Sequence, residues 1–173
     1  MKMNPFAVFE QASSEQELEQ FQSLIQKEGF TAFRHFLDGF RERLKGFDET
    51  EIEKITTLLE RAKQLFPVPG HFSPVWQVVW NEFEQLIAYK ITVLESIPQA
   101  DRDGEWQILI DNPFTNSDIV CYPSLSFIEG AYMYAYFRTD LKQNEYIRLQ
   151  KIQNLIMAFG SEGSAKKEKS KDR

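Results

Sequence analysis

The side chains best suited to catalysis are few in this chain and lie far apart. A single cysteine, Cys121, sits among apolar residues just before Pro123, and the only histidines are His35 and His71. A catalytic thiol needs a base within reach that lowers its pKa, and neither histidine lies in a context typical of cysteine hydrolases. We therefore expect Cys121 to be a small, buried and chemically inert residue of a β-strand.

The sequence also lacks the common patterns for binding metals or phosphate. A zinc site needs three or four clustered ligands, and one cysteine with two scattered histidines offers no cluster. The acidic residues show no EF-hand spacing, and neither G-x-x-x-x-G-K-[ST] nor G-x-G-x-x-G occurs. A carboxylate site for a harder cation stays open as an alternative, but no particular cofactor is indicated.

The helix expected over residues 126–139 carries the side chains best suited to a ligand pocket. It begins with a Ser126–Glu129 capping-box pattern and is rich in tyrosine and phenylalanine. We expect Glu129, Tyr132 and Arg138 to line any pocket beside this helix, because a buried carboxylate near a cation is typical of binding sites. The alternative is that Glu129 only completes the capping box and the tyrosines belong to the core.

A long loop between two short strands provides the second candidate site. Residues 106–110 and 119–122 are short apolar runs, and the segment between them is dense in turn-forming residues. This pattern predicts a β-hairpin whose loop is longer than a tight connection needs. Phe114 near its middle either folds back onto the domain or anchors a partner protein, and we identify Asp111, Asn112 and Phe114 as candidate interaction residues.

Hydrophobic spacing predicts a largely helical domain. The expected helices, besides residues 126–139, cover residues 14–28, 30–45, 48–66, 74–96 and 143–159. The 74–96 helix is apolar nearly all round, so we place it at the centre of the domain, with Trp80 and Phe83 in the core. The expected fold class is therefore mainly α (α+β): a single domain of about six helices with one small β-hairpin.

Composition and charge limit the partners and the cellular setting. The 173 residues carry a net charge of −6, but the last thirteen are net positive and lack apolar side chains for a core. We expect residues 1–160 to form one domain and residues 161–173 to be a disordered tail. An acidic body repels nucleic acid and anionic lipid heads, and no window is apolar enough to span a membrane. One cysteine and no signal-peptide pattern predict a cytoplasmic protein.

The block DNPF…DIVCYP…GAYMYAYFRTDL…NEYIRLQKI resembles the YpuI-like family of Bacillus-type bacterial proteins. The resemblance covers about a third of the chain. It implies a bacterial cytoplasmic protein, and it brings no activity, substrate or site residues to this sequence.

These observations favour a non-catalytic protein-interaction or regulatory module that binds another protein or a second copy of itself. The sequence shows no nucleophile with its base, no metal cluster and no nucleotide loop. The alternative is an enzyme or small-ligand binder with a pocket beside the 126–139 helix. A pocket with convergent polar side chains favours the ligand alternative, whereas an exposed apolar patch at the hairpin favours a protein partner.

Overall fold

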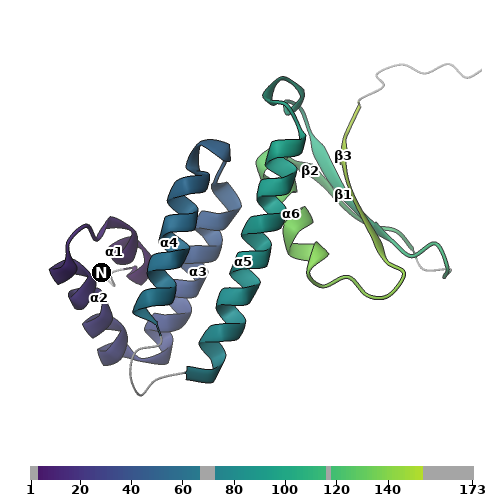
Figure 1. The fold of residues 1–173 in the computed structure, drawn as a ribbon. Coiled ribbons are helices and arrows are strands. Elements are labelled where there is room, and N and C mark those ends of the chain that lie inside the picture. Colours follow the sequence, from purple (N-terminus) through teal and green to yellow (C-terminus); the bar gives the residue numbers. More distant parts are fainter. Residues whose placement is uncertain (1–3, 67–72, 116–117, 154–173) are drawn as a thin grey trace, which may run out of the picture.

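Figure 1 shows a row of helices with a small sheet at its C-terminal side. The computed structural model describes residues 4–66, 73–115 and 118–153, with the side chains of the fifth helix described from residue 76. The helices are α1 (Pro5–Gln11), α2 (Glu15–Glu28), α3 (Phe30–Gly46), α4 (Ile52–Leu65), α5 (Ser73–Ser96) and α6 (Phe127–Arg138). Two 3-10 turns are η1 (Glu49–Glu51) and η2 (Gln99–Asp101), and the strands are β1 (Trp106–Asp111), β2 (Val120–Leu125) and β3 (Tyr146–Lys151).

The described residues form a mainly α fold with a small antiparallel sheet, as the sequence predicts, although one element differs in kind. Helix α1 has no counterpart among the expected helices. The helix expected over residues 143–159 is wrong, because the segment forms β3 instead. Ile147 and Leu149 are half-buried and alternate with exposed residues, which is the period of a strand. Residues 154–159 of the expected helix lie outside the described residues.

The sheet has the strand order β2-β1-β3, and both pairings are antiparallel. The expected β1–β2 hairpin is present, but β2 continues past Pro123, where the sequence suggested that it ends. The register shifts between Trp106 and Ile108 of β1, and Ser124 has a φ of 61°. A bulge on an edge strand tolerates a proline, because its missing amide is not needed by a neighbouring strand.

Helix α6 lies between the sheet and α5 (Figure 1). A Cβ atom on Gly130 would lie 2.9 Å from Cδ1 of Leu149 and 3.6 Å from Cβ of Trp106. Ala131 and Ala135 are fully buried. The small residues of α6 therefore let this aromatic helix approach its neighbours closely.

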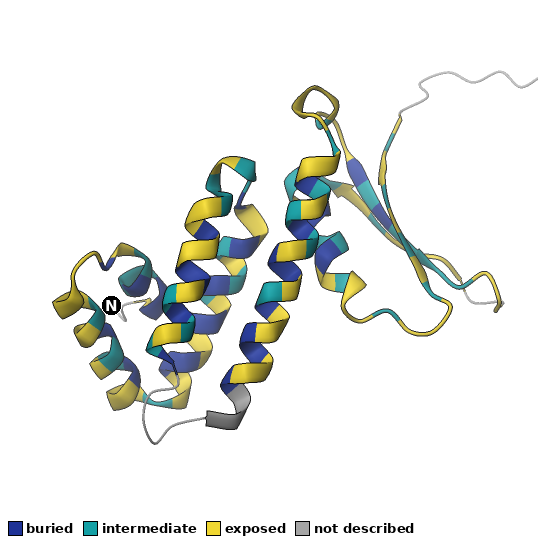
Figure 2. Cartoon of the chain, viewed as in Figure 1, coloured by how far each residue is buried: buried dark blue, intermediate teal, exposed yellow. Residues whose placement is uncertain are grey.

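Helix α5 is the central helix, as predicted, and lies between α3 and α4 on one side and α6 on the other (Figure 1). Its buried side chains recur at steps of three and four: Trp76, Val79, Trp80, Phe83, Leu86, Ile87, Lys90 and Leu94. The prediction that α5 has no polar face is wrong, because Gln77, Asn81 and Gln85 form part of an exposed face (Figure 2). Trp80 and Phe83 belong to the core, as expected.

Helix α1 packs closely against α3 at Gly39. A Cβ atom at position 39 would lie 2.4 Å from Cβ of Phe6, so this approach requires glycine. The contact brings the phenylalanine rings of the two helices together, with ring-centre distances of 5.3 Å for Phe6–Phe40 and 5.2 Å for Phe9–Phe36. The first helix therefore completes an aromatic cluster that α3 alone would leave open to solvent.

Lys90 of α5 is completely buried and binds the C-terminal end of α3. Its Nζ donates hydrogen bonds to the carbonyl oxygens of Leu44 at 2.7 Å and Lys45 at 2.9 Å, and it lies 4.0 Å from the centre of the Phe47 ring. The last carbonyls of a helix have no amide partner within the helix. Lys90 supplies the missing donors, and burial lowers the pKa of its amine to about 7.

Arg102 joins the end of α5 to the start of η1 and to the sheet. Its guanidinium donates to the carbonyl oxygen of Leu94 and pairs with the carboxylate of Glu49. Hydrogen bonds from Arg102 and from the Gln99 amide lower the pKa of Glu49 to about 2. The indole Nε1 of Trp106 donates to the carbonyl oxygen of Arg102 at 3.0 Å, which connects β1 to the same network.

The close packing of α1 on α3 predicts the effect of adding one methyl group. In an open helix interior, alanine is about 1 kcal/mol more favourable than glycine. We expect Gly39→Ala instead to lower the free energy of unfolding by about 1–3 kcal/mol, because its Cβ would overlap Phe6. The control is Gly46→Ala, where a Cβ would meet nothing within 4 Å. Urea unfolding that finds the two variants equally stable would contradict this packing.

The buried amine predicts a pH-dependent loss of stability in Lys90→Met. The variant leaves two carbonyl oxygens of α3 without donors, and we expect it to be about 1–3 kcal/mol less stable at pH 8. Between pH 7 and the ordinary lysine pKa of 10.5, the unfolded chain holds more protons on Lys90 than the folded chain does. Wild-type stability therefore rises with pH relative to the variant over this window.

Urea unfolding at pH 6, 8 and 9.5 measures this difference, and Lys54→Met, which removes an exposed lysine of α4, is the control. A stability gap that stays constant or narrows with rising pH would show that Lys90 does not titrate in this range.

Candidate functional site

Exposed apolar side chains gather at the end of the sheet where β1 and β2 are connected. Among the described residues, seven large apolar side chains are highly exposed, and four of them lie here. The four are Phe114, Ile119, Val120 and Tyr146. The strand register pairs Val120 with Ile110 and Tyr146 with Asp111, so these residues share one end of the sheet, which we call the hairpin end. Val120 and Tyr146 lie on opposite faces of the sheet there, because Ile110 and Asp111 are successive residues of β1.

The predicted interaction residues Asp111, Asn112 and Phe114 lie together at the hairpin end. The side-chain oxygen of Asn112 accepts a hydrogen bond from the amide of Phe114 at 3.0 Å, and its carbonyl oxygen accepts one from the Thr115 amide at 3.2 Å. The carboxylate of Asp111 lies 3.8 Å from the guanidinium of Arg148 on β3. Asp111 and Asn112 therefore shape the end of the sheet, while Phe114 is 69% exposed.

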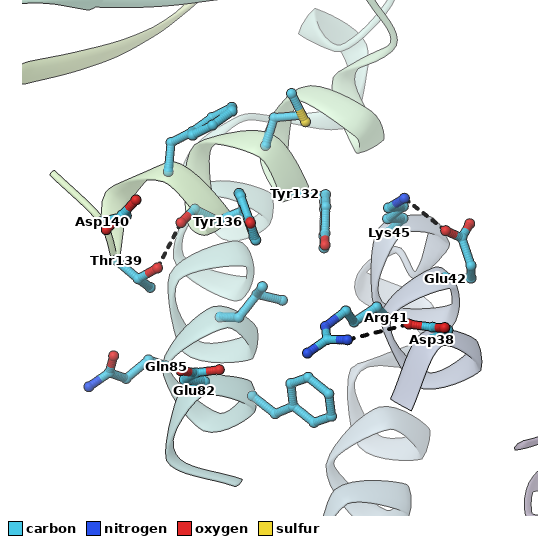
Figure 3. Close-up of a pocket in the computed structure, with 14 residues that line it drawn as sticks. Asp38, Arg41, Glu42, Lys45, Glu82, Gln85, Tyr132, Tyr136, Thr139 and Asp140 are labelled. Carbon is cyan, nitrogen blue, oxygen red and sulfur yellow. Dashed lines mark hydrogen bonds and ion pairs between the residues drawn. The ribbon is translucent and has the colours of Figure 1, made fainter. Parts of the chain in front are cut away.

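A half-open groove of about 930 Å³ lies among α3, α5 and α6 (Figure 3). Phe83 and Leu86 of α5 and Tyr132 of α6 provide its apolar surface. Tyr132 is almost fully buried, and burial raises the pKa of its hydroxyl. Tyr136 stacks on Tyr132 with ring centres 6.2 Å apart and continues the aromatic surface outwards. The groove therefore lies beside the aromatic helix, where the sequence placed a possible pocket.

The structure does not bring the three predicted pocket residues together. Tyr132 lines the groove, but Glu129 is exposed and completes the capping box, with its carboxylate 3.0 Å from the Ser126 amide. The guanidinium carbon of Arg138 lies 4.1 Å from the centre of the Tyr89 ring, and Arg138 does not line the groove.

Charged residues on α3 and α5 line the groove instead, and the sequence reading missed them. Arg41 and Lys45 are four residues apart on α3, beside the buried positions Phe40 and Leu44. This spacing places both cations on one edge of the apolar stripe of α3, which the sequence alone indicates. The spacing does not indicate which other helix packs beside that edge, so it could not predict a groove there.

The prediction that Cys121 is buried is wrong, because the thiol is exposed. Cys121 pairs with Leu109 of β1, whereas the buried Trp106 and Ile108 show that the even-numbered positions of β1 face α6. Successive residues of a strand alternate between the two faces of a sheet, so Cys121 lies on the face away from α6. Its Sγ is 3.7 Å from the side-chain oxygen of Gln107.

Within the described ranges, no three His, Cys, Asp or Glu side chains are placed to hold a metal ion. His35 lies on the exposed face of α3, and His71 falls outside the described residues. None of the helices in the part that the structure describes has the length and apolar composition to cross a membrane.

Comparisons of this chain with protein-family models, with curated proteins and with solved structures found no match.

The position of Cys121 predicts its reactivity. We expect an aromatic disulfide reagent to modify the folded protein at the rate of an ordinary exposed thiol, because the side chain lies on the open face of the sheet. Cys121→Ser should change the free energy of unfolding by less than about 0.5 kcal/mol, as at other surface sites. Labelling that is more than about tenfold slower in the folded than in the urea-unfolded chain would contradict this placement.

Proposed function

We propose that this protein is a non-catalytic protein-interaction module, which binds another protein or a second copy of itself through the hairpin end. One observation carries the proposal: four of the seven highly exposed large apolar side chains of the described residues lie there. Clusters of exposed apolar residues commonly mark protein contacts, and large aromatic side chains contribute much of the binding energy at such contacts.

The geometry of the hairpin end suits a contact of this kind. Phe114 lies in a turn that Asn112 shapes through hydrogen bonds. These bonds lower the conformational entropy that Phe114 loses when its ring enters a partner's pocket. The Asp111–Arg148 pair lies beside the apolar residues, which is the usual arrangement of a polar rim around an apolar contact. A depression of about 450 Å³ beside Ile110 and Val120 offers room for a partner side chain.

The proposed setting is the bacterial cytoplasm. The resemblance of the block within residues 111–152 to the YpuI-like family supports a bacterial origin, and a chain with one cysteine suits a reducing compartment.

The groove beside α6 supports the alternative function, the binding of a small ligand. Its volume of about 930 Å³ falls in the range of ligand sites, and polar side chains converge on it. Small-molecule sites, however, enclose most of their ligand, and this groove is half-open. The groove is therefore better suited to a longer segment than to an enclosed small molecule.

The proposal predicts that Phe114→Asp weakens partner binding without unfolding the protein. We expect its free energy of unfolding to change by less than about 0.5 kcal/mol, because the ring is mostly exposed. Placing a photoreactive benzoylphenylalanine at Tyr146 and irradiating cells that make the full chain should give cross-links to the partner. In the Phe114→Asp background, the yield should fall by at least about tenfold.

The matched control is Val78→Asp, which alters an exposed apolar residue of α5. It should leave the cross-linking yield unchanged. The absence of cross-links from position 146, or equal losses in the two backgrounds, would contradict a role for the hairpin end. Cross-links to a second copy of the chain would identify the partner as the protein itself.

A further inference from the structure

The α3 wall of the groove presents cations towards its aromatic surface. The guanidinium carbon of Arg41 lies 5.7 Å from the centre of the Phe83 ring, and Nζ of Lys45 lies 5.8 Å from the centre of the Tyr132 ring. Figure 3 shows Arg41 extending from α3 into the groove. The attraction between a cation and an aromatic face therefore holds both bases inwards.

The acidic partners of these two bases are turned more towards solvent. Asp38 lies 3.5 Å from Arg41, and Glu42 lies 2.8 Å from Lys45. The side chains of the two acids are 65% and 71% exposed, compared with 41% and 46% for the two bases. Salt bridges this exposed contribute little energy, so a ligand carboxylate can compete for the bases.

The charged residues of the opposite wall are all acidic. Glu82 of α5 lines the groove across from α3, and Asp140, just after α6, does the same (Figure 3). Neither carboxylate forms an ion pair within the described residues, and both are exposed. Asp38 and Glu42 also line the α3 side, so a ligand in the groove meets bases that are paired with exposed acids on that side, and carboxylates without an ion-pair partner among the described residues on the other.

An apolar surface separates the two walls. Phe83, Leu86 and Tyr132 line it and are all buried or nearly so, because they also belong to the core. The α3 wall runs from Asp38 to Lys45, about two helical turns or roughly 10 Å. These dimensions match the buried face of a short helix, which presents apolar residues at steps of three and four.

We propose that the groove binds an amphipathic α-helix of a partner protein, with an acidic flank facing Arg41 and Lys45 and a basic flank facing Glu82 and Asp140. Its apolar stripe lies on the surface that Phe83, Leu86 and Tyr132 provide. Because the groove is formed by three helices, an added helix packs by the same ridges-into-grooves geometry. This surface is separate from the hairpin end, so the inference holds or fails independently of the function proposed above.

Synthetic peptides test the inference directly with the full chain. Three fluorescein-labelled peptides of about 18 residues, long enough to form a helix, share one leucine stripe. One has an acidic and a basic flank, the second has two acidic flanks and the third has two basic flanks. By fluorescence anisotropy, we expect the wild-type protein to bind the mixed-flank peptide about three- to tenfold more tightly than the others. The preference should weaken as salt rises.

Charge reversals identify the walls. The pair Arg41→Glu and Lys45→Glu makes the α3 wall acidic and should move the preference to the peptide with two basic flanks. The pair Glu82→Lys and Asp140→Lys makes the opposite wall basic and should move it to the peptide with two acidic flanks. Lys54→Glu, a reversal at an exposed lysine of α4, is the control and should keep the wild-type ranking. Thermal melts establish that each variant is folded, and two independent pairs keep the test valid if one pair unfolds.

Several results would overturn the inference. Failure of all three peptides to bind the wild-type protein with a Kd below about 1 mM is one, and an identical ranking in all variants is another. A wild-type dimer that the Arg41→Glu and Lys45→Glu pair dissociates in sedimentation would show that a second copy fills the groove. A rise of more than about tenfold in peptide affinity on deleting residues 154–173 would show that the chain's own C-terminal segment fills it.

Discussion

The amine of Lys90 holds the end of α3 against α5, and the position of α3 in the fold depends on this contact. It is the one fully buried charged side chain among the described residues, and it donates to the carbonyl oxygens of Leu44 and Lys45. Placing an amine in the core is costly, as its lowered pKa shows. The arrangement persists because the last carbonyl oxygens of a helix have no amide partner within the helix and need another donor.

The same junction sets the geometry of the groove and of the sheet. The carbonyl oxygen of Lys45 accepts a hydrogen bond from Lys90, and the side chain of Lys45 lines the groove. The contact that holds the end of α3 therefore also positions this base in the groove. At the end of α5, Arg102 binds the carbonyl oxygen of Leu94 and the carboxylate of Glu49, and its own carbonyl oxygen binds Trp106. The side chains at the helix ends thus connect α5 to β1, and α6 packs between α5 and the sheet.

The helices that the sequence predicted correctly are those marked by a local pattern, either a capping pair or a regular spacing of hydrophobic residues. The Ser126–Glu129 capping box is present, and Asp48 and Glu51 form another where the helix expected over residues 48–66 begins, at a 3-10 turn that leads into α4. Five of the six helices and the β1–β2 hairpin follow from hydrophobic spacing and turn residues. The hairpin residues Asp111, Asn112 and Phe114 also lie together as expected, because they are neighbours in the chain. Such features depend on contacts within a few residues, which the sequence encodes directly.

What the sequence by itself determined is the kind of fold: a mainly helical domain with a small sheet, and a central helix containing Trp80 and Phe83. Only the tertiary structure decided which faces are covered. The segment at Ile147 and Leu149 became a strand because β1 offers it an edge to pair with, and pairing between distant segments outweighs a weak helical pattern. Cys121 is exposed because α6 covers only the other face of the sheet. The groove needs Arg41, Glu82 and Tyr132 from three helices, and no local pattern specifies how helices far apart in the sequence pack together.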